Sequence, residues 1–91
     1  MKYTAATLQK HEKVLEEAGY IIRYEKGTFQ SGYCILEQRK VVVLNRFLNV
    51  ENRINILIEL IPVLNIDADQ LSSESGKLYE ALKKNSSPQE L

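Results

Sequence analysis

The stretch Ile54–Leu64, which reads INILIELIPVL, is a helix-length run that is apolar almost all the way round. A helix of this kind is normally buried between layers instead of lying on a surface. On a helical wheel its apolar side chains form two faces, separated by a narrow polar strip that contains Asn55 and Glu59. Pro62 removes one backbone hydrogen bond, so the helix should kink or end nearby. The rest of the fold is expected to assemble around this segment.

Outward from this run, the sequence predicts a helix over residues 50–64 with Asn49 as its N-cap. A first helix is predicted over residues 5–18, because apolar side chains recur there at three- and four-residue spacing. Thr4 or Thr7 can cap its start, and Gly19 stands where a left-handed residue commonly ends a helix.

A third helix is predicted to start at Asp67 or Asp69, with leucines on its apolar side. Serines and a glycine weaken its middle, so one helix and two shorter pieces both remain open. Residues 85–91 are polar and contain Pro88, which indicates a flexible C-terminal tail.

Three strands are predicted between the first two helices, over residues 20–25, 33–37 and 40–45. The third is apolar on both faces, which is typical of a strand that is central or covered on both sides. Gly27–Gly32 reads as a turn and a bulge. Gln38 and Arg39 lie at a hairpin tip whose loop is expected to exceed two residues. The order α-β-β-β-α-α predicts one α+β domain over residues 1–84, a three-stranded antiparallel sheet with helices packed on it.

Composition narrows the class of protein. Twelve basic and twelve acidic residues cancel, so no long-range field steers the chain toward nucleic acid or an acidic membrane. The longest apolar run is about half the roughly 20 residues that a membrane span needs. The first residues lack the apolar core of a secretory signal, and Cys34 is the only cysteine, so no disulfide forms within the chain. A cytoplasmic protein without a membrane partner is expected.

Few residues could support metal or covalent chemistry. A zinc site needs three or four ligands, and the chain has one histidine and one cysteine, on different predicted elements. His11 lies on or beside the apolar face of the first helix and is expected to be packed. Cys34 could form a nucleophile–base pair with His11, but a cysteine inside a strand is more commonly a small hydrophobic residue. We expect no metal and no cofactor.

Two further patterns carry weaker functional hypotheses. Arginines and lysines near Tyr24 or Tyr33 could form a basic sheet face for single-stranded nucleic acid, although no aromatic motif at fixed spacing supports this. Glu59, an acid on an apolar helix, suggests a general base or a ligand-binding carboxylate. Its place on the polar strip equally predicts simple exposure to solvent.

The order of elements around Glu59 resembles the core of the small zinc metallopeptidases of the ImmA/IrrE type. In that family a strand leads to an active-site helix of the form T-L-x-H-E-x-x-H-x-L. Here the strand ends at Asn45, the helix follows, and Glu59 matches the glutamate of the motif. The two histidines fall at Ile58 and Pro62, which cannot bind a metal. The resemblance therefore implies a degenerate, metal-free relative without peptidase activity.

These observations together predict a small non-catalytic interaction or regulatory module. The second apolar face of the 50–64 helix, with Ile56, Leu60 and Val63, predicts the interface of a homodimer or of another protein partner. Alternatively, the third helix folds back and covers that face. Two other functions stay open: a small-ligand binder or enzyme that uses Glu59 in a cleft, and a weak nucleic-acid binder.

Overall fold

The computed structural model describes residues 2–26 and 33–85. The α-helices are α1 (Ala5–Glu17), α2 (Val50–Leu60) and α3 (Ser73–Asn85), and the strands are β1 (Ile21–Glu25), β2 (Tyr33–Leu36) and β3 (Val41–Asn45). Three short 3-10 turns complete the described elements: η1 (Glu37–Arg39), η2 (Ile61–Val63) and η3 (Ala68–Gln70). The predicted turn and bulge at Gly27–Gly32 and nearly all of the predicted tail lie outside the described residues.

The predicted helix boundaries are confirmed where capping chemistry fixes them. The hydroxyl of Thr4 accepts a hydrogen bond from the backbone N–H of Thr7, and the side chain of Asn49 accepts one from that of Asn52. Gly19 has a φ of 93°, the left-handed conformation that a residue after a helix favours and that glycine adopts without strain.

α2 ends close to Pro62, as predicted. α2 stops at Leu60, and the turn η2 continues the chain through Pro62. The predicted third helix is divided: Asp67 accepts a hydrogen bond from the N–H of Asp69 at the start of η3, and α3 begins separately at Ser73.

The sheet is mixed, so the prediction of a purely antiparallel sheet was wrong. Its order is β1-β3-β2, with β1 parallel to β3 and β2 antiparallel to β3. The β2–β3 hairpin has the expected longer loop, formed by η1 and by Lys40 with a φ of 52°. The position of β3 explains the parallel pair. A strand that is apolar on both faces buries most surface at the centre of a sheet, so β3 lies between β1 and β2 instead of following β2 at an edge.

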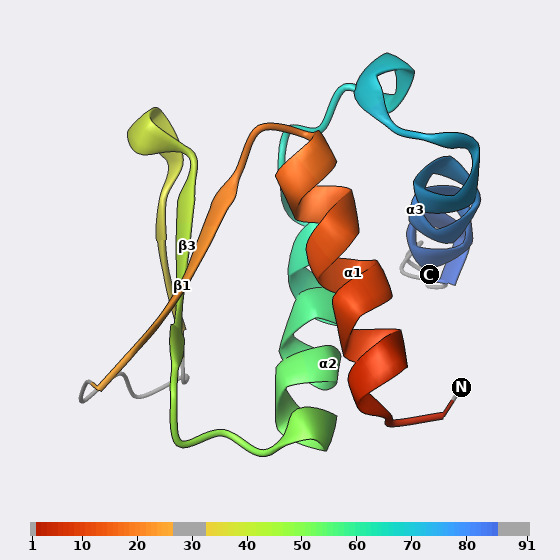
Figure 1. Cartoon of the computed structure of the whole chain (residues 1–91). Coiled ribbons are helices and arrows are strands. Elements are labelled where there is room, and N and C mark those ends of the chain that lie inside the picture. The colour runs from red at the N-terminus through yellow and green to blue at the C-terminus, as the bar shows by residue number, and fades with distance from the viewer. Residues whose placement is uncertain (1, 27–32, 86–91) are drawn as a thin grey trace, which may run out of the picture.

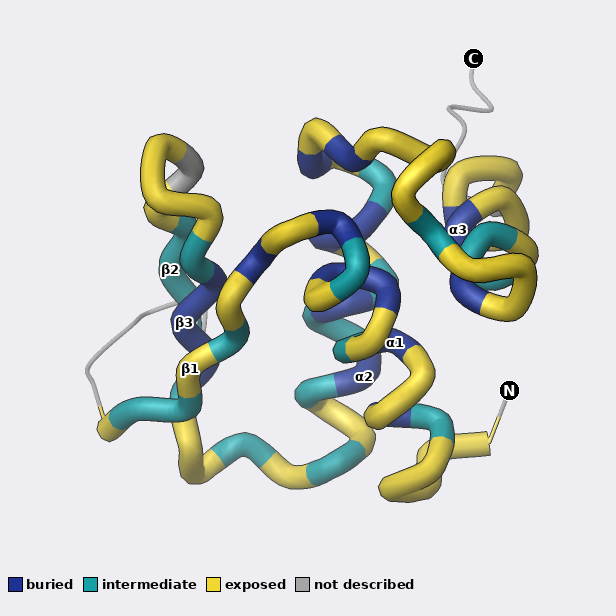
Figure 2. The backbone as a smooth tube through the Cα atoms, turned by 45° about the horizontal axis from the view of Figure 1, so that its top comes forward, coloured by how far each residue is buried: buried dark blue, intermediate teal, exposed yellow. Residues whose placement is uncertain are grey.

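The described elements form three layers (Figure 1): the sheet, then α1 with α2, then α3 on the far side of α1. The core lies between the sheet and the α1–α2 layer and continues to α3 through Tyr79 and Leu82, and Figure 2 shows buried segments in each layer. Fully buried side chains come from all of its walls, including Leu15, Leu44, Ile54, Leu57 and Ile61. The Ile54–Leu64 stretch therefore supplies three of these five residues, as its all-round apolar pattern predicted.

Candidate functional site

One face of the sheet points away from the three described α-helices (Figure 1). We call it the outer face. Alternation along the strands and the register between them assign its residues, which are Ile21, Arg23, Glu25, Cys34, Leu36, Val41, Val43 and Asn45. The intervening residues of the strands, such as Ile22, Val42 and Leu44, belong to or pack against the core.

An aliphatic row crosses the outer face at one end. Ile21 and Leu36 stand beside Val41 on its two neighbouring strands. Ile21 is 58% exposed and Leu36 is 46% exposed, whereas Val43 in the next row is only 8% exposed. Val43 is nevertheless not part of the core cluster. The face thus has a filled apolar centre with exposed aliphatic side chains at its edges.

Charged residues surround this apolar row. Arg23 and Glu25 of β1 form an ion pair at 2.6 Å on the outer face. At the opposite edge, a hollow is lined by Ile35, Leu36, Gln38 and Arg39. The side chain of Arg39 is exposed there, next to the exposed Leu36. A basic rim thus borders the aliphatic row at the β2–β3 turn.

Although the net charge of the chain is zero, its basic and acidic residues are distributed unevenly between the strand-bearing segment and the rest. Residues 20–48, which contain the three strands, carry five basic and two acidic residues, a net charge of +3. The remaining residues carry seven basic and ten acidic residues, a net charge of −3. The strand-bearing segment is therefore basic, and it favours a ligand or partner with negative charge.

The residues that the sequence put forward on α2 do not form one exposed site. Leu60 is 3% exposed and belongs to the core, Ile56 is half-buried, and Val63 in η2 is 74% exposed. Contacts of α3 with η2 and α1 show that the third helix folds back toward this side. Glu59 is exposed, as the polar strip predicted, and it does not line the hollow at Arg39 or the groove between α1 and α3.

His11 and Cys34 are not brought together. His11 is 1% exposed within the helical layer, where its Nδ1 donates to the carbonyl of Thr7 at 2.8 Å and its Nε2 has no hydrogen-bond partner among the described residues. Cys34 is half-buried on the outer face. Over residues 2–26 and 33–85, no group of three or more His, Cys, Asp or Glu side chains could hold a metal ion.

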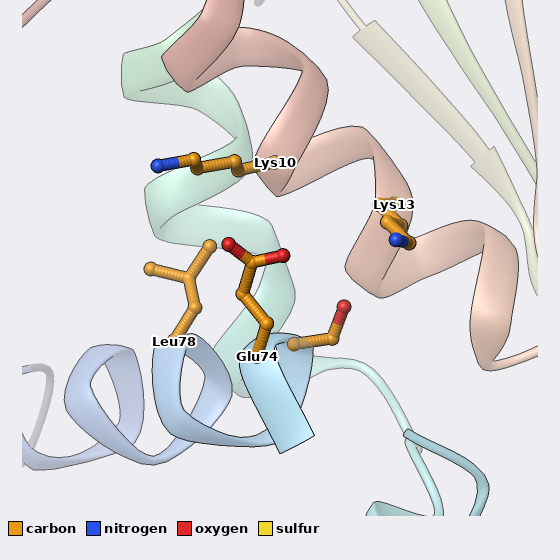
Figure 3. A pocket seen from close by; sticks show the side chains of 5 residues that line it. Lys10, Lys13, Glu74 and Leu78 are labelled. Atoms are coloured by element: carbon orange, nitrogen blue, oxygen red, sulfur yellow. The ribbon is translucent and has the colours of Figure 1, made fainter. Parts of the chain in front are cut away.

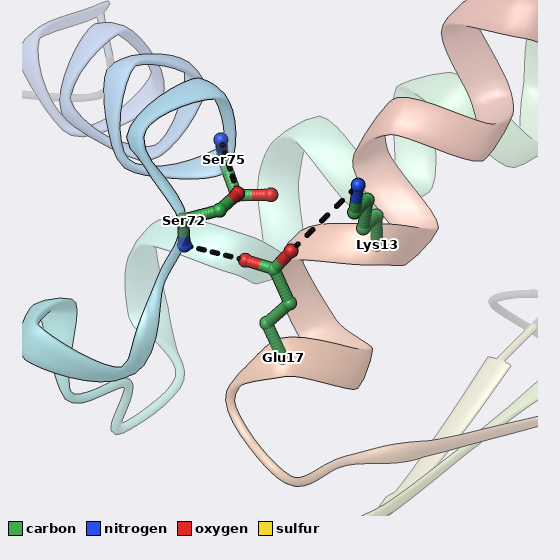
Figure 4. A network of polar contacts seen from close by, with 4 residues as sticks. All are labelled: Lys13, Glu17, Ser72 and Ser75. Carbon is green, nitrogen blue, oxygen red and sulfur yellow. Dashed lines mark hydrogen bonds and ion pairs between the residues drawn. The ribbon is translucent and has the colours of Figure 1, made fainter.

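A second surface feature is the groove of about 210 Å³ between α1 and α3, lined by Lys10, Lys13, Glu74, Ser75 and Leu78. Figure 3 shows that the carboxylate of Glu74 extends from α3 toward α1. Next to the groove, the Glu17 carboxylate accepts a hydrogen bond from the backbone N–H of Ser72 at 2.7 Å and lies 3.9 Å from Lys13 (Figure 4). Lys13 therefore already has a carboxylate beside it, and the Glu74 carboxylate also lines the groove, so the groove does not favour an anion.

A third cluster, around Tyr24, is half-buried and connects the sheet to α1 and α2. Its phenol donates to the Glu12 carboxylate on α1, and the guanidinium of Arg53 stacks 4.5 Å from its ring centroid. Arg53 also donates to the carbonyls of Leu48 and Arg46, at 2.9 and 2.8 Å. Burial and the bond to Glu12 raise the pKa of the Tyr24 phenol well above its ordinary value. All these partners lie within the chain, which indicates a structural role.

Sequence reasoning identified β3 as apolar on both faces but did not use that fact to find a site. Val41 and Val43 alternate with the core residues Val42 and Leu44, so they form a second apolar face of β3. No described helix covers that face. The tyrosines of the predicted nucleic-acid face, Tyr24 and Tyr33, pack against the core instead. The described residues of the outer face therefore include no aromatic platform for base stacking.

Comparison with family models, with curated proteins and with solved structures found no match for this chain. Among its described residues, no helix combines the length and apolar character needed to cross a bilayer.

Proposed function

We propose that this chain is a non-catalytic interaction module that binds another protein through its outer face. The observation that carries the proposal is the aliphatic row in which exposed Ile21 and Leu36 flank half-buried Val41, on a sheet whose other face packs against the helices. A pair of parallel strands is normally covered on both faces. Exposed, contiguous apolar residues with a charged rim are typical of protein-binding surfaces.

The outer face replaces the α2 face as the proposed interface. On α2, Leu60 is buried in the core, so it does not form an exposed apolar face together with Val63. Ile21, Val41 and Leu36 are instead adjacent across three strands. A cytoplasmic location, expected from the sequence, remains part of this proposal.

The absence of catalysis is likewise part of the proposal, and the resemblance to ImmA/IrrE-type peptidases supports it. The order helix, three strands, helix is kept, but Ile58 and Pro62 occupy the positions of the family's metal-binding histidines. A relative of such an enzyme without zinc would retain only the scaffold and its surfaces. The alternative with Glu59 in a cleft has less support, because Glu59 is exposed on the outside of α2.

Site-specific photo-crosslinking tests the proposed function. A benzophenone amino acid at Leu36 is expected to give protein adducts in the host cell, and the additional substitution Ile21→Lys should reduce their yield. The matched control places the same group at Val63, which is even more exposed but lies on η2. Equal adduct yields from Leu36 and Val63 would refute a specific protein-binding face.

A further inference from the structure

The size and charge of the outer face indicate what kind of partner covers it. We infer that the occupant is a single amphipathic helix of another protein, with acidic residues beside its apolar stripe. This inference rests on the proposed function and adds the chemistry of the partner to it. It excludes a second copy of this chain as the partner that covers the outer face.

The outer face is too small for a stable interface between two copies of this chain. The outer face has eight described side-chain positions, two of which form the Arg23–Glu25 ion pair. A stable interface between two globular proteins uses roughly 20–30 residues on each side. Two copies packed sheet to sheet through this face would fall far short of that number. Three strands are about 14 Å wide, which accommodates one helix of about 10 Å diameter.

The length of the face agrees with a short helix. The longest strands, β1 and β3, have five residues each. Five residues of strand extend about 17 Å, a distance that about 11 residues of α-helix also span. Such a helix presents three or four apolar side chains on one stripe, which is enough to cover the row formed by Ile21, Val41 and Leu36.

The second argument is charge complementarity. The strand-bearing segment 20–48 has a net charge of +3, although the chain as a whole is neutral. Arg39 is exposed beside Leu36 at the rim of a hollow, and it forms no ion pair with another described residue. Carboxylates that flank the apolar stripe of a partner would reach this rim. The pairing would affect mainly the association rate and the choice of partner.

Two stapled helical peptides provide the direct test. The acidic probe carries leucines on one face and glutamates beside them, and the basic probe has lysines in place of the glutamates. Fluorescence anisotropy with the full chain at low salt should show that the acidic probe binds at least about tenfold more tightly than the basic probe, since like charge on the basic probe opposes binding. Methyl NMR should place the acidic probe on Ile21, Leu36 and Val41.

Charge variants link binding to the proposed rim. Arg39→Glu should weaken the acidic probe about threefold to tenfold, because one attractive charge becomes repulsive in a largely solvent-exposed setting. Lys77→Glu makes the same change of charge on the exposed side of α3 and should leave binding unchanged. Equal binding of the two probes, or no effect of Arg39→Glu, overturns the inference.

The remaining outcomes separate this inference from the proposed function. If Leu36 crosslinks a protein in cells but the acidic probe does not bind, the acidic helix is rejected and the binding face stands. If neither occurs, both are rejected. If analytical ultracentrifugation shows a dimer that Ile21→Lys dissociates, a second copy covers the face and the inference is wrong.

Discussion

The carboxylate of Glu17, at the end of α1, accepts a hydrogen bond from the backbone N–H of Ser72, 55 residues later in the chain. Ser72 in turn accepts a hydrogen bond from the N–H of Ser75, in the first turn of α3. The acidic side chain therefore lies at the positive end of the α3 dipole, where a negative charge is favourable. This contact attaches the outermost helical layer to the rest of the fold.

The Glu17 contact predicts a pH-dependent attachment of α3. The Ser72 backbone hydrogen bond holds the pKa of Glu17 below its usual value. The stabilisation is therefore present above the unfolded-state pKa of about 4.3 and is lost as the pH falls through the lower, folded-state pKa. The protection of α3 amides, which is the intrinsic exchange rate at each pH divided by the observed rate, should fall on acidification through this range. In Glu17→Gln, this protection should already be lower at neutral pH and should depend much less on pH; a protection profile like that of the unchanged chain would contradict the role of Glu17.

Tyr24 predicts an effect at alkaline pH. Because its pKa is raised in the folded protein, stability is fully present below about pH 10 and falls as the pH rises further, where the unfolded phenol ionises first. Absorbance at 295 nm should reveal one tyrosine that ionises last. Tyr24→Phe should remove that late titration and flatten the alkaline loss of stability. Tyr3→Phe, at an exposed position, is the control and should leave both properties unchanged.

Substitutions at two apolar positions of the Ile54–Leu64 stretch should have very different effects on the free energy of unfolding. Leu57 is fully buried in the core, so Leu57→Ala should cost about 2–5 kcal/mol of unfolding free energy through lost burial and the cavity left behind. Val63 is 74% exposed, and Val63→Ala should change stability by no more than about 0.5 kcal/mol. Urea denaturation followed by circular dichroism measures both. Similar losses for the two variants would contradict the placement of η2.

The stability of the protein should depend on the planar guanidinium of Arg53 as well as on its charge. Its Nε and Nη2 donate to two carbonyls of the β3–α2 connection, and its plane stacks on Tyr24. Lysine keeps the charge but cannot reproduce this planar double contact. Arg53→Lys should lower stability by about 1–2 kcal/mol and speed hydrogen exchange at residues 46–49. Arg23→Lys, at an exposed ion pair, should have little effect on either measurement.

The sequence predicted the elements well because each depends on local chemistry. The caps at Thr4 and Asn49, the left-handed Gly19 and the helix end before Pro62 are short-range effects that neighbouring residues determine. Two apolar faces are typical of a strand that is central or covered on both sides, and β3 is central. Its pairing with β1 was not predicted, because the residues within a strand do not show which strand will lie beside it; with β3 between β1 and β2, the chain runs in the same direction along β1 and β3.

The candidate site was harder to predict for a related reason. Helical periodicity gave α2 two apolar faces but could not show that Leu60 would be buried while Val63, three residues later, would be exposed beyond Pro62. Whether a face is covered depends on the positions of all the layers. Once the helices are placed on one side of the sheet, the alternation of Val41 and Val43 with the core residues of β3 identifies the outer face.

Methyl NMR in extract of the host cell tests the central proposal most directly. The chain, labelled at isoleucine, leucine and valine methyl groups, is compared in whole extract and in extract digested with protease and then inhibited. Binding at the outer face predicts that the signals of Ile21, Leu36 and Val41 shift or broaden in whole extract only, while Val63 stays unchanged. Perturbation of Val63 and Ile56 without the outer face would contradict the account, as would identical spectra in the two extracts.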